Sequence, residues 1–176
     1  MLLAIDPGPQ LSAWVIYNGD LVEHDISPNE KLLERILWNS TKVDHVPEWM
    51  VIERMVSYGR PVGTATFETV YWTGVFCQAF GRERTTRMDR RPVKKHLCPS
   101  TADATQVRTI KDGNIRQALI DLWIDRTDNM KPHRKGGPLY RVSKDTWQAL
   151  ALGVTWWDTE REWISKKLPA SMRVGL

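Results

Sequence analysis

The chain has 176 residues, of which 41% are hydrophobic and 26% are charged. This length fits one domain with its own core, and the composition excludes a disordered or fibrous protein. The formal net charge of +4 at pH 7 favours a polyanionic partner. No apolar run is long enough to span a bilayer, and Asp6 interrupts the first apolar stretch too early for a signal peptide. Cys77 and Cys98 lack metal-ligand or disulfide spacing, which favours reduced thiols in a cytoplasmic protein.

Hydrophobic periodicity and turn residues predict one α/β domain over residues 1–176. Asn18-Gly19 favours a type I′ hairpin between the second and third strands, because both positions of that turn need positive φ. Ser27 and Pro28 are typical of a helix start, and Ser143 is a candidate cap for the last helix. Strands are predicted over residues 1–6, 13–17, 21–26, 49–53 and 84–88, and helices over 28–38, 64–80, 92–97, 111–124 and 143–164. The order indicates a mixed five-stranded sheet, with three antiparallel strands followed by parallel strands, and helices on both faces.

Three acidic residues lie at the ends of predicted elements. Asp6 closes the first strand, Glu53 closes the fourth, and Asp145 opens the last helix. Carboxylate oxygens are ligands that Mg²⁺ prefers, so three acids gathered at one edge of a sheet indicate a metal site. Each acid taken singly is also typical of a structural role, as a turn or helix cap. The sequence contains no Gly-x-Ser-x-Gly motif, no supported Cys/His pair and no phosphate-binding Gly-x-x-x-x-Gly-Lys loop.

Basic residues gather in two stretches, which we expect to contact nucleic-acid phosphates, although solvated surface is the other explanation. The first stretch covers residues 82–96 and includes Arg84, Arg87, Arg90, Arg91, Lys94 and Lys95. The second leads directly to Asp145 and includes Lys131, Arg134, Lys135 and Arg141. A third, smaller group follows Glu53 and consists of Arg54, Tyr58 and Arg60. Its aromatic ring is suited to stacking on a base, or else the Tyr58-Gly59 pair is only a turn.

The element order, with acids on the first and fourth strands and on a late helix, resembles the ribonuclease-H-like nuclease fold. Within that fold, three segments resemble the RuvC-type Holliday-junction resolvases, in a bacteriophage-like branch. The segments are Leu3-Ala4-Ile5-Asp6-Pro7-Gly8, Val51-Ile52-Glu53 and Asp145-Thr146-Trp147-Gln148-Ala149-Leu150-Ala151. The resemblance follows nearly the whole chain in order.

This resemblance implies a homodimeric, magnesium-dependent endonuclease that nicks four-way DNA junctions symmetrically in recombination and repair. It implies two bound ions, Mn²⁺ as a substitute, no small-molecule cofactor, and the host-cell cytoplasm for a bacteriophage protein. Asp6, Glu53 and Asp145 correspond to the catalytic metal ligands. Gln148 stands where the family usually has Asp, but it lies one helical turn from Asp145 and could bind a metal through its carbonyl. Lys111 is a candidate for stabilising the scissile phosphate, or a solvent-exposed lysine of the first turn.

Two other functions stay open beside the resolvase. One is a junction- or duplex-binding protein with a degenerate active site, for which Gln148 is the motive. The other is a nuclease of the same fold that acts on RNA–DNA hybrids or other branched DNA. The helix over 64–80 carries more apolar residues than one face should bury, so we expect a dimer interface or surplus core residues there. Those residues are Phe67, Val70, Tyr71, Gly74 and Phe76.

Overall fold

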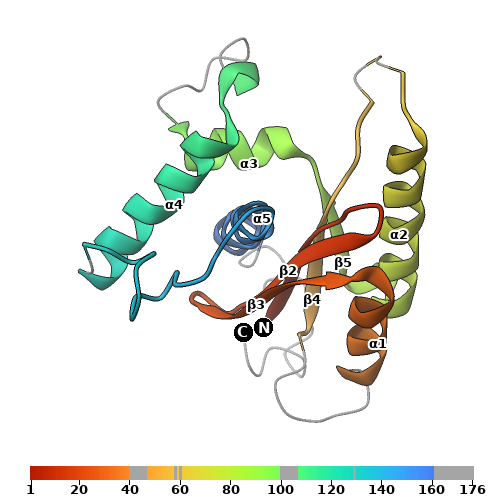
Figure 1. Ribbon diagram of the computed structural model, residues 1–176, viewed down its shortest axis with the longest axis horizontal. Coiled ribbons are helices and arrows are strands. Elements are labelled where there is room, and N and C mark those ends of the chain that lie inside the picture. The colour runs from red at the N-terminus through yellow and green to blue at the C-terminus, as the bar shows by residue number, and fades with distance from the viewer. Residues whose placement is uncertain (40–46, 58, 60, 100–106, 129, 161–176) are drawn as a thin grey trace.

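The computed structural model describes residues 1–39, 47–57, 59, 61–99, 107–128 and 130–160, and it consists of one sheet between two layers of helices (Figure 1). The sheet has five strands in the order β3-β2-β1-β4-β5. The strands are β1 (Leu2–Asp6), β2 (Leu11–Tyr17), β3 (Leu21–Pro28), β4 (Trp49–Glu53) and β5 (Thr85–Met88). β2 is antiparallel to both β1 and β3, whereas β4 is parallel to β1 and β5. The predicted mixed sheet is therefore confirmed.

Helices cover both faces of this sheet, as predicted. α1 and α2 lie together on one side, and α3, α4 and α5 lie on the other (Figure 1). The helices are α1 (Asn29–Asn39), α2 (Thr64–Phe80), α3 (Arg90–Leu97), α4 (Asp112–Thr127) and α5 (Thr146–Thr159), with short 3-10 turns η1 (Arg82–Arg84) and η3 (Val107–Thr109). No helix in the described part of the chain is both long enough and apolar enough to cross a membrane.

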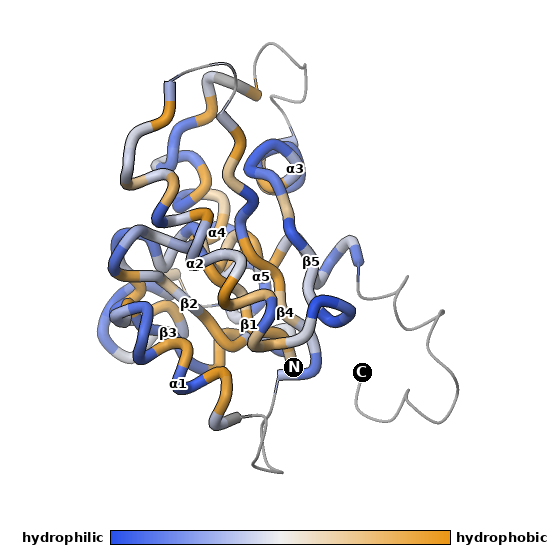
Figure 2. The backbone as a smooth tube through the Cα atoms, turned by 90° about the vertical axis from the view of Figure 1, so that its right-hand side faces the viewer, coloured by the Kyte–Doolittle hydropathy of each residue, from blue (hydrophilic) through white to orange (hydrophobic). Residues whose placement is uncertain are grey.

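Alternation along the strands divides the core into two layers, because successive side chains of a strand point to opposite faces. Leu3 and Ile5 of β1 belong to the layer under α1 and α2, whereas Leu2 and Ala4 belong to the layer under α5. Figure 2 shows the contrast between the hydrophobic central strands and the hydrophilic α3. The central strands are therefore packed on both faces, which fixes the backbone at the ends of β1 and β4.

α5 lies directly against the sheet and is buried along most of its length. Its close approach depends on Gly153, where a Cβ would lie 3.3 Å from the Ala4 Cβ and 3.6 Å from Val15 Cγ2. This contact holds the beginning of α5 over the sheet edge at which β1 ends.

Three local predictions are wrong in detail. The 18–20 hairpin forms, but positive φ is found at Gly19 and not at Asn18, so the turn is not type I′. Ser27 does not cap a helix, because β3 continues to Pro28 and the Ser27 hydroxyl accepts a hydrogen bond from Trp14 Nε1 at 3.0 Å. α5 begins after Asp145 rather than at a Ser143 cap, and its predicted end at residue 164 lies outside the described residues. In each case pairing within the sheet or packing on it outweighed a local signal.

Candidate active site

Two acidic side chains meet where the central strands end. β1 and β4 are parallel neighbours with Ile5 paired to Ile52, so Asp6 and Glu53 project from adjacent strand ends. The two carboxyl groups are within hydrogen-bonding distance of each other. Glu53 is only 9% exposed. Two like charges are thereby held close together in a poorly hydrated position.

Burial is the main cause of a large pKa shift at this pair. The pKa of Asp6 is raised from 3.8 to about 8, mainly by burial and then by the neighbouring Glu53 carboxylate and, more weakly, Asp145, whereas Arg90 opposes the shift. Burial also raises the pKa of Glu53, with Arg90 and Lys94 opposing. Since two carboxylates in contact cannot both ionise cheaply, the pair retains a proton near neutral pH unless a cation is bound. The site therefore favours positive charge.

Asp145 lies at the rim of this pair. It is the residue before the first turn of α5, and its side chain makes no capping hydrogen bond to the helix, although its backbone carbonyl accepts from Gln148 N at 2.9 Å. The carboxylate is exposed, and its charge reaches Asp6. Gln148 is one turn further along α5 and only 6% exposed. The absence of a side-chain cap disfavours the interpretation of Asp145 as an ordinary capping acid.

Arg90, which the sequence predicts to contact DNA, lies beside this carboxylate pair. Arg90 Nε lies 3.7 Å from Glu53 Oε2, and Arg90 Nη2 lies 3.5 Å from Asp112 Oδ1 at the start of α4. Lys94, one helical turn along α3, donates from Nζ to the Ile110 carbonyl at 2.7 Å. Two cations thus border the carboxylate pair on the α3 side.

The junction between β4 and α3 is clamped by a second ion pair. Arg54 binds both carboxylate oxygens of Asp89, with Nη2 at 2.7 Å from Oδ2, and its backbone N–H donates to the Met88 carbonyl at 2.9 Å. This contact holds the pKa of the Asp89 carboxyl below its usual range. Because Glu53 precedes Arg54 and Arg90 follows Asp89, the clamp also fixes the distance between Glu53 and Arg90.

A buried polar network supports the turn after Asp6. The Ser12 hydroxyl donates to Asn29 Oδ1 at 2.7 Å and accepts from Gly8 N–H at 3.2 Å, while Asn29 Nδ2 donates to the Gly8 carbonyl at 3.0 Å. Ser12 and Asn29 are both fully buried. Together these hydrogen bonds tie the Asp-Pro-Gly turn to β2 and α1, so the backbone that carries Asp6 has little freedom.

The donor set suits a hard divalent cation. No group of three or more His, Cys, Asp and Glu side chains within the described residues is assembled closely enough to enclose a metal. Magnesium keeps several of its waters, however, and commonly binds through one or two carboxylates. The raised pKa values of Asp6 and Glu53 show that Arg90 and Lys94 do not offset the burial of the two acids. The pair therefore fits such an ion, with Asp145 and Gln148 as further oxygen donors nearby.

Comparison with solved structures identifies the architecture. The chain matches Thermus thermophilus RuvC in complex with Holliday junction substrate, with a TM-score of 0.56, 15% identity, and coverage of 92% of this chain and 94% of that one. A second Thermus thermophilus RuvC structure matches with a TM-score of 0.53, 16% identity, and coverage of 92% and 95%. The fold is that of RuvC. No protein-family model matches the sequence, and neither does any curated protein.

On this RuvC-like fold, the other predicted site residues fall in several places. Lys111 is exposed at the start of α4, between Ile110, which accepts from Lys94, and Asp112, which pairs with Arg90. Its backbone N–H binds Asn114 Oδ1 at 2.9 Å, so the helix start is well anchored beside the site. Tyr58 and Arg60 lie outside the described residues.

The 82–96 stretch does not form one continuous basic face. Arg84 is tied to the end of α2 by a 2.7 Å bond to the Phe80 carbonyl. Arg87 shares a pocket of about 510 Å³ with Arg54 and Arg82, between β5 and α2. The others lie on α3, where Arg91 and Lys95 are exposed and Arg90 and Lys94 face the carboxylates. Exposed side chains also make up the second basic stretch, namely Lys131, Arg134, Lys135 and Arg141.

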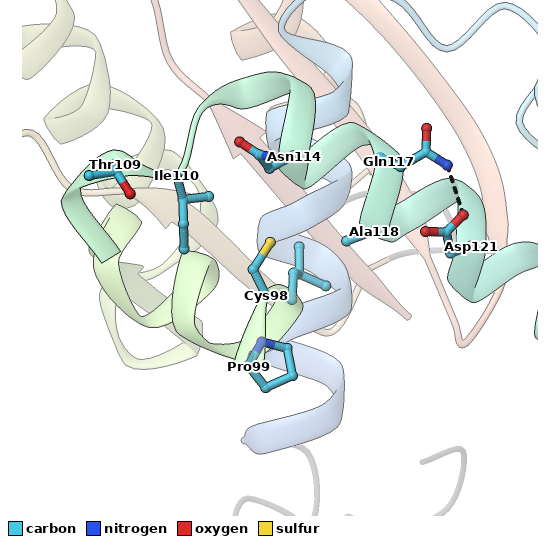
Figure 3. Close-up of a pocket in the computed structure, with 9 residues that line it drawn as sticks. Cys98, Pro99, Thr109, Ile110, Asn114, Gln117, Ala118 and Asp121 are labelled. Carbon is cyan, nitrogen blue, oxygen red and sulfur yellow. Dashed lines mark hydrogen bonds between the residues drawn. The ribbon is translucent and has the colours of Figure 1, made fainter. Parts of the chain in front are cut away.

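A separate pocket of about 420 Å³ lies between the end of α3 and α4 (Figure 3). Cys98 and Pro99 line one side, and Asn114, Gln117 and Asp121 follow α4 on the other, where Gln117 Nε2 donates to Asp121 Oδ1 at 2.8 Å. None of the acidic site residues contributes to its lining. The pocket is therefore distinct from the carboxylate pair.

Sequence reasoning missed four contributors to the site: Arg90 as a partner of Glu53, Asp112, Ser12 and Asn29. A usable signal existed only for Arg90, which follows the end of a strand parallel to β4 and so must lie at the same sheet edge as Glu53. Asp112 and Asn29 contact the site through pairings between segments remote in sequence, for which a single chain gives no indication.

Proposed function

We propose that the protein is a metal-dependent endonuclease that nicks four-way DNA junctions. The observation that carries this proposal is the pairing of half-buried Asp6 with buried Glu53 at the central edge of a RuvC-like sheet. Burying two acids in contact is unfavourable for stability, so a site that keeps them together has a use for the negative charge. The similarity of the fold to a RuvC structure with a bound Holliday junction supports four-way DNA junctions as the substrate.

Asp6 and Glu53 would hold Mg²⁺ or Mn²⁺, with Asp145 and Gln148 as candidate donors at the α5 side. A divalent ion in this position supplies charge stabilisation at a phosphodiester and lowers the pKa of a bound water. The protein's own contribution is orientation. The Ser12–Asn29 network fixes the backbone of Asp6, and the Arg54–Asp89 clamp fixes Glu53 against α3.

Cations around the pair suit a DNA backbone. Lys94 borders Glu53 on α3, and Lys111 is exposed at the start of α4 on the same side. We infer that these lysines contact the phosphates nearest the site, whereas Arg87 and the other exposed arginines and lysines bind the arms of the junction. Such contacts are sequence-independent and weaken with salt.

Cleavage of a synthetic four-way junction in Mg²⁺, Mn²⁺ or Ca²⁺ tests the proposal, with a linear duplex and a fork as comparison substrates. We expect the wild type to nick the junction in Mg²⁺ and Mn²⁺, and Asp6→Asn to lose cleavage while keeping junction affinity. Asp121→Asn, which removes an equal charge from an exposed position on α4, is the matched control and should cleave normally. Cleavage by Asp6→Asn at the wild-type rate would show that the site is wrongly assigned.

A second candidate function is junction binding without cleavage, and Gln148 is the observation that favours it. This residue is buried, one helical turn from Asp145, and it supplies no negative charge where the resemblance implies an acid. Stoichiometric binding of the junction with no nicking in any of the metals would support this alternative. Gln148→Asp in the same assay discriminates further, since restored cleavage would assign the loss to this position.

The proposed function also includes a homodimer formed through α2, because a four-way junction needs two symmetric cuts. Phe67, Val70 and Tyr71 are 63%, 51% and 62% exposed on this helix, whereas Phe76 is fully buried and belongs to the core. Gly74 continues the exposed stripe, and no atom lies within 4 Å of a Cβ built there. A glycine in mid-helix costs about 1 kcal/mol relative to alanine, and close approach of a second copy would explain it.

The dimer is testable by sedimentation or light scattering. Phe67→Glu and Gly74→Leu should each convert dimer to monomer, and the open space at Gly74 means that the monomer can accommodate the leucine. Val22→Glu, at an exposed apolar position of the edge strand β3, is the control and should leave the dimer intact. A dimer that persists in both α2 variants would exclude this helix as the interface.

A further inference from the structure

Arg90 is the one side chain that joins the carboxylate pair to the start of α4 by ion pairs in the described part of the chain. Its guanidinium lies 3.7 Å from Glu53 and 3.5 Å from Asp112, and the side chain is 39% exposed. The buried Nε has no hydrogen-bond partner among the described residues. Arg90 therefore acts on Glu53 through its charge more than through a directed hydrogen bond.

The pairing of β5 with β4 determines the position of the Arg90 charge. β5 is parallel to β4 with Glu53 paired to Met88, so the residue two positions after β5 reaches the end of β4. The Arg54–Asp89 ion pair then closes the same junction from the other direction. Because arginine side chains remain charged in proteins, Arg90 is a permanent cation beside Glu53.

Charges of both signs surround the carboxylate pair. Arg90 lowers the pKa of Glu53 and that of Asp6, and Lys94 also lowers that of Glu53, whereas Asp145 raises that of Asp6 and Asp112 raises that of Glu53. Gln148, on the helix that carries Asp145, contributes no charge. The four carboxylates Asp6, Glu53, Asp145 and Asp112 together with the two cations Arg90 and Lys94 leave two formal negative charges, which one divalent ion balances.

We propose that the Arg90 guanidinium serves as a fixed cation at Glu53 and takes the place of a second divalent ion, so that each protomer binds one ion, held by Asp6 and Glu53 with Asp145 as a further donor. This inference rests on the proposed function, and it differs from the two ions that the resemblance implies. Arg90 is here a positioning residue, since it neutralises a ligand of the ion and contacts no ion itself.

Counting bound Mn²⁺ tests the inference, by calorimetry and by the electron paramagnetic resonance of free Mn²⁺ on the full chain without DNA. We expect one ion per protomer for the wild type and two for Arg90→Gln, which opens Glu53 to a second ion. Arg90→Lys keeps the charge and should bind one. Arg91→Gln removes the same charge from the next residue of α3, whose charge acts on Asp89, and should also bind one.

Two ions, or none, in the wild type would overturn the inference, as would a second ion failing to bind to a folded Arg90→Gln protein. Circular dichroism and a urea transition establish folding for each variant, and the wild-type and Arg90→Lys counts stand even if Arg90→Gln does not fold. The Mg²⁺ dependence of cleavage gives an independent readout, which is first order for one ion. A protein that binds one ion but cuts no junction refutes the proposed function alone, whereas an active nuclease with two ions refutes only this inference.

Discussion

Asp6→Asn should make the protein more stable at alkaline pH when divalent ions are removed. The pKa of Asp6 in the folded protein is about 8, against 3.8 for the ordinary value. Because the folded pKa is the higher one, the stabilisation from the bound proton is complete below pH 4 and is lost as the pH rises to 8. At 1.36 kcal/mol per unit, the loss between pH 5 and pH 8 is at most ~4 kcal/mol. Because Asp6 shares one proton with Glu53, the loss of stability is smaller than this limit, and we expect it to be about 2–4 kcal/mol.

Asparagine has the shape of the protonated acid and does not titrate, so its stability should not fall in this way. Urea transitions in EDTA at pH 5 and pH 8 measure the effect. The free energy of unfolding of Asp6→Asn minus that of the wild type should grow by about 2–4 kcal/mol between the two pH values. Saturating Mg²⁺ should stabilise the wild type at pH 8 but not the variant, because ligands that bind only the folded state stabilise it.

Asp121→Asn provides the control, and its effect should stay within about 0.5 kcal/mol at both pH values, as for most surface substitutions. A difference between Asp6→Asn and the wild type that is the same at pH 5 and pH 8 would refute the reasoning. It would mean that Asp6 is ionised across this range in the folded protein, and that the site is better hydrated than its burial implies.

Two further substitutions test the supports of the site. Asn29→Ala removes both hydrogen bonds that tie Gly8 and Ser12 to α1, and it should lower the free energy of unfolding by about 2–3 kcal/mol and slow cleavage; an unchanged urea midpoint would contradict this. Gly153→Val should lower the free energy of unfolding by about 1–3 kcal/mol, because the Cβ alone would lie 3.3 Å from Ala4 Cβ. Gly74→Ala, at an open helix position, is the control for Gly153→Val, and a stable Gly153→Val protein would show that α5 shifts freely.

Local patterns were sufficient for most of the secondary structure. Apolar runs that end in Asp6 and Glu53 predict buried strands, and their order with the intervening helix predicts parallel neighbours, which is how the structure pairs them. The helix starts were less accurate. Ser27 and Ser143 carry good capping signals, yet sheet pairing and the packing of α5 decided where those helices begin.

The sequence by itself determined the layered sheet and the meeting of two acids at its edge, because alternation and chain order are local properties that constrain strand direction. Only the tertiary structure decided which charges surround those acids. Arg90 appeared to belong to a continuous basic stretch, but the end of β5 turns it toward Glu53 while Arg91 stays exposed. The orientation of such a side chain depends on where its strand ends relative to the neighbouring strand. That relation is set by packing between segments far apart in the chain.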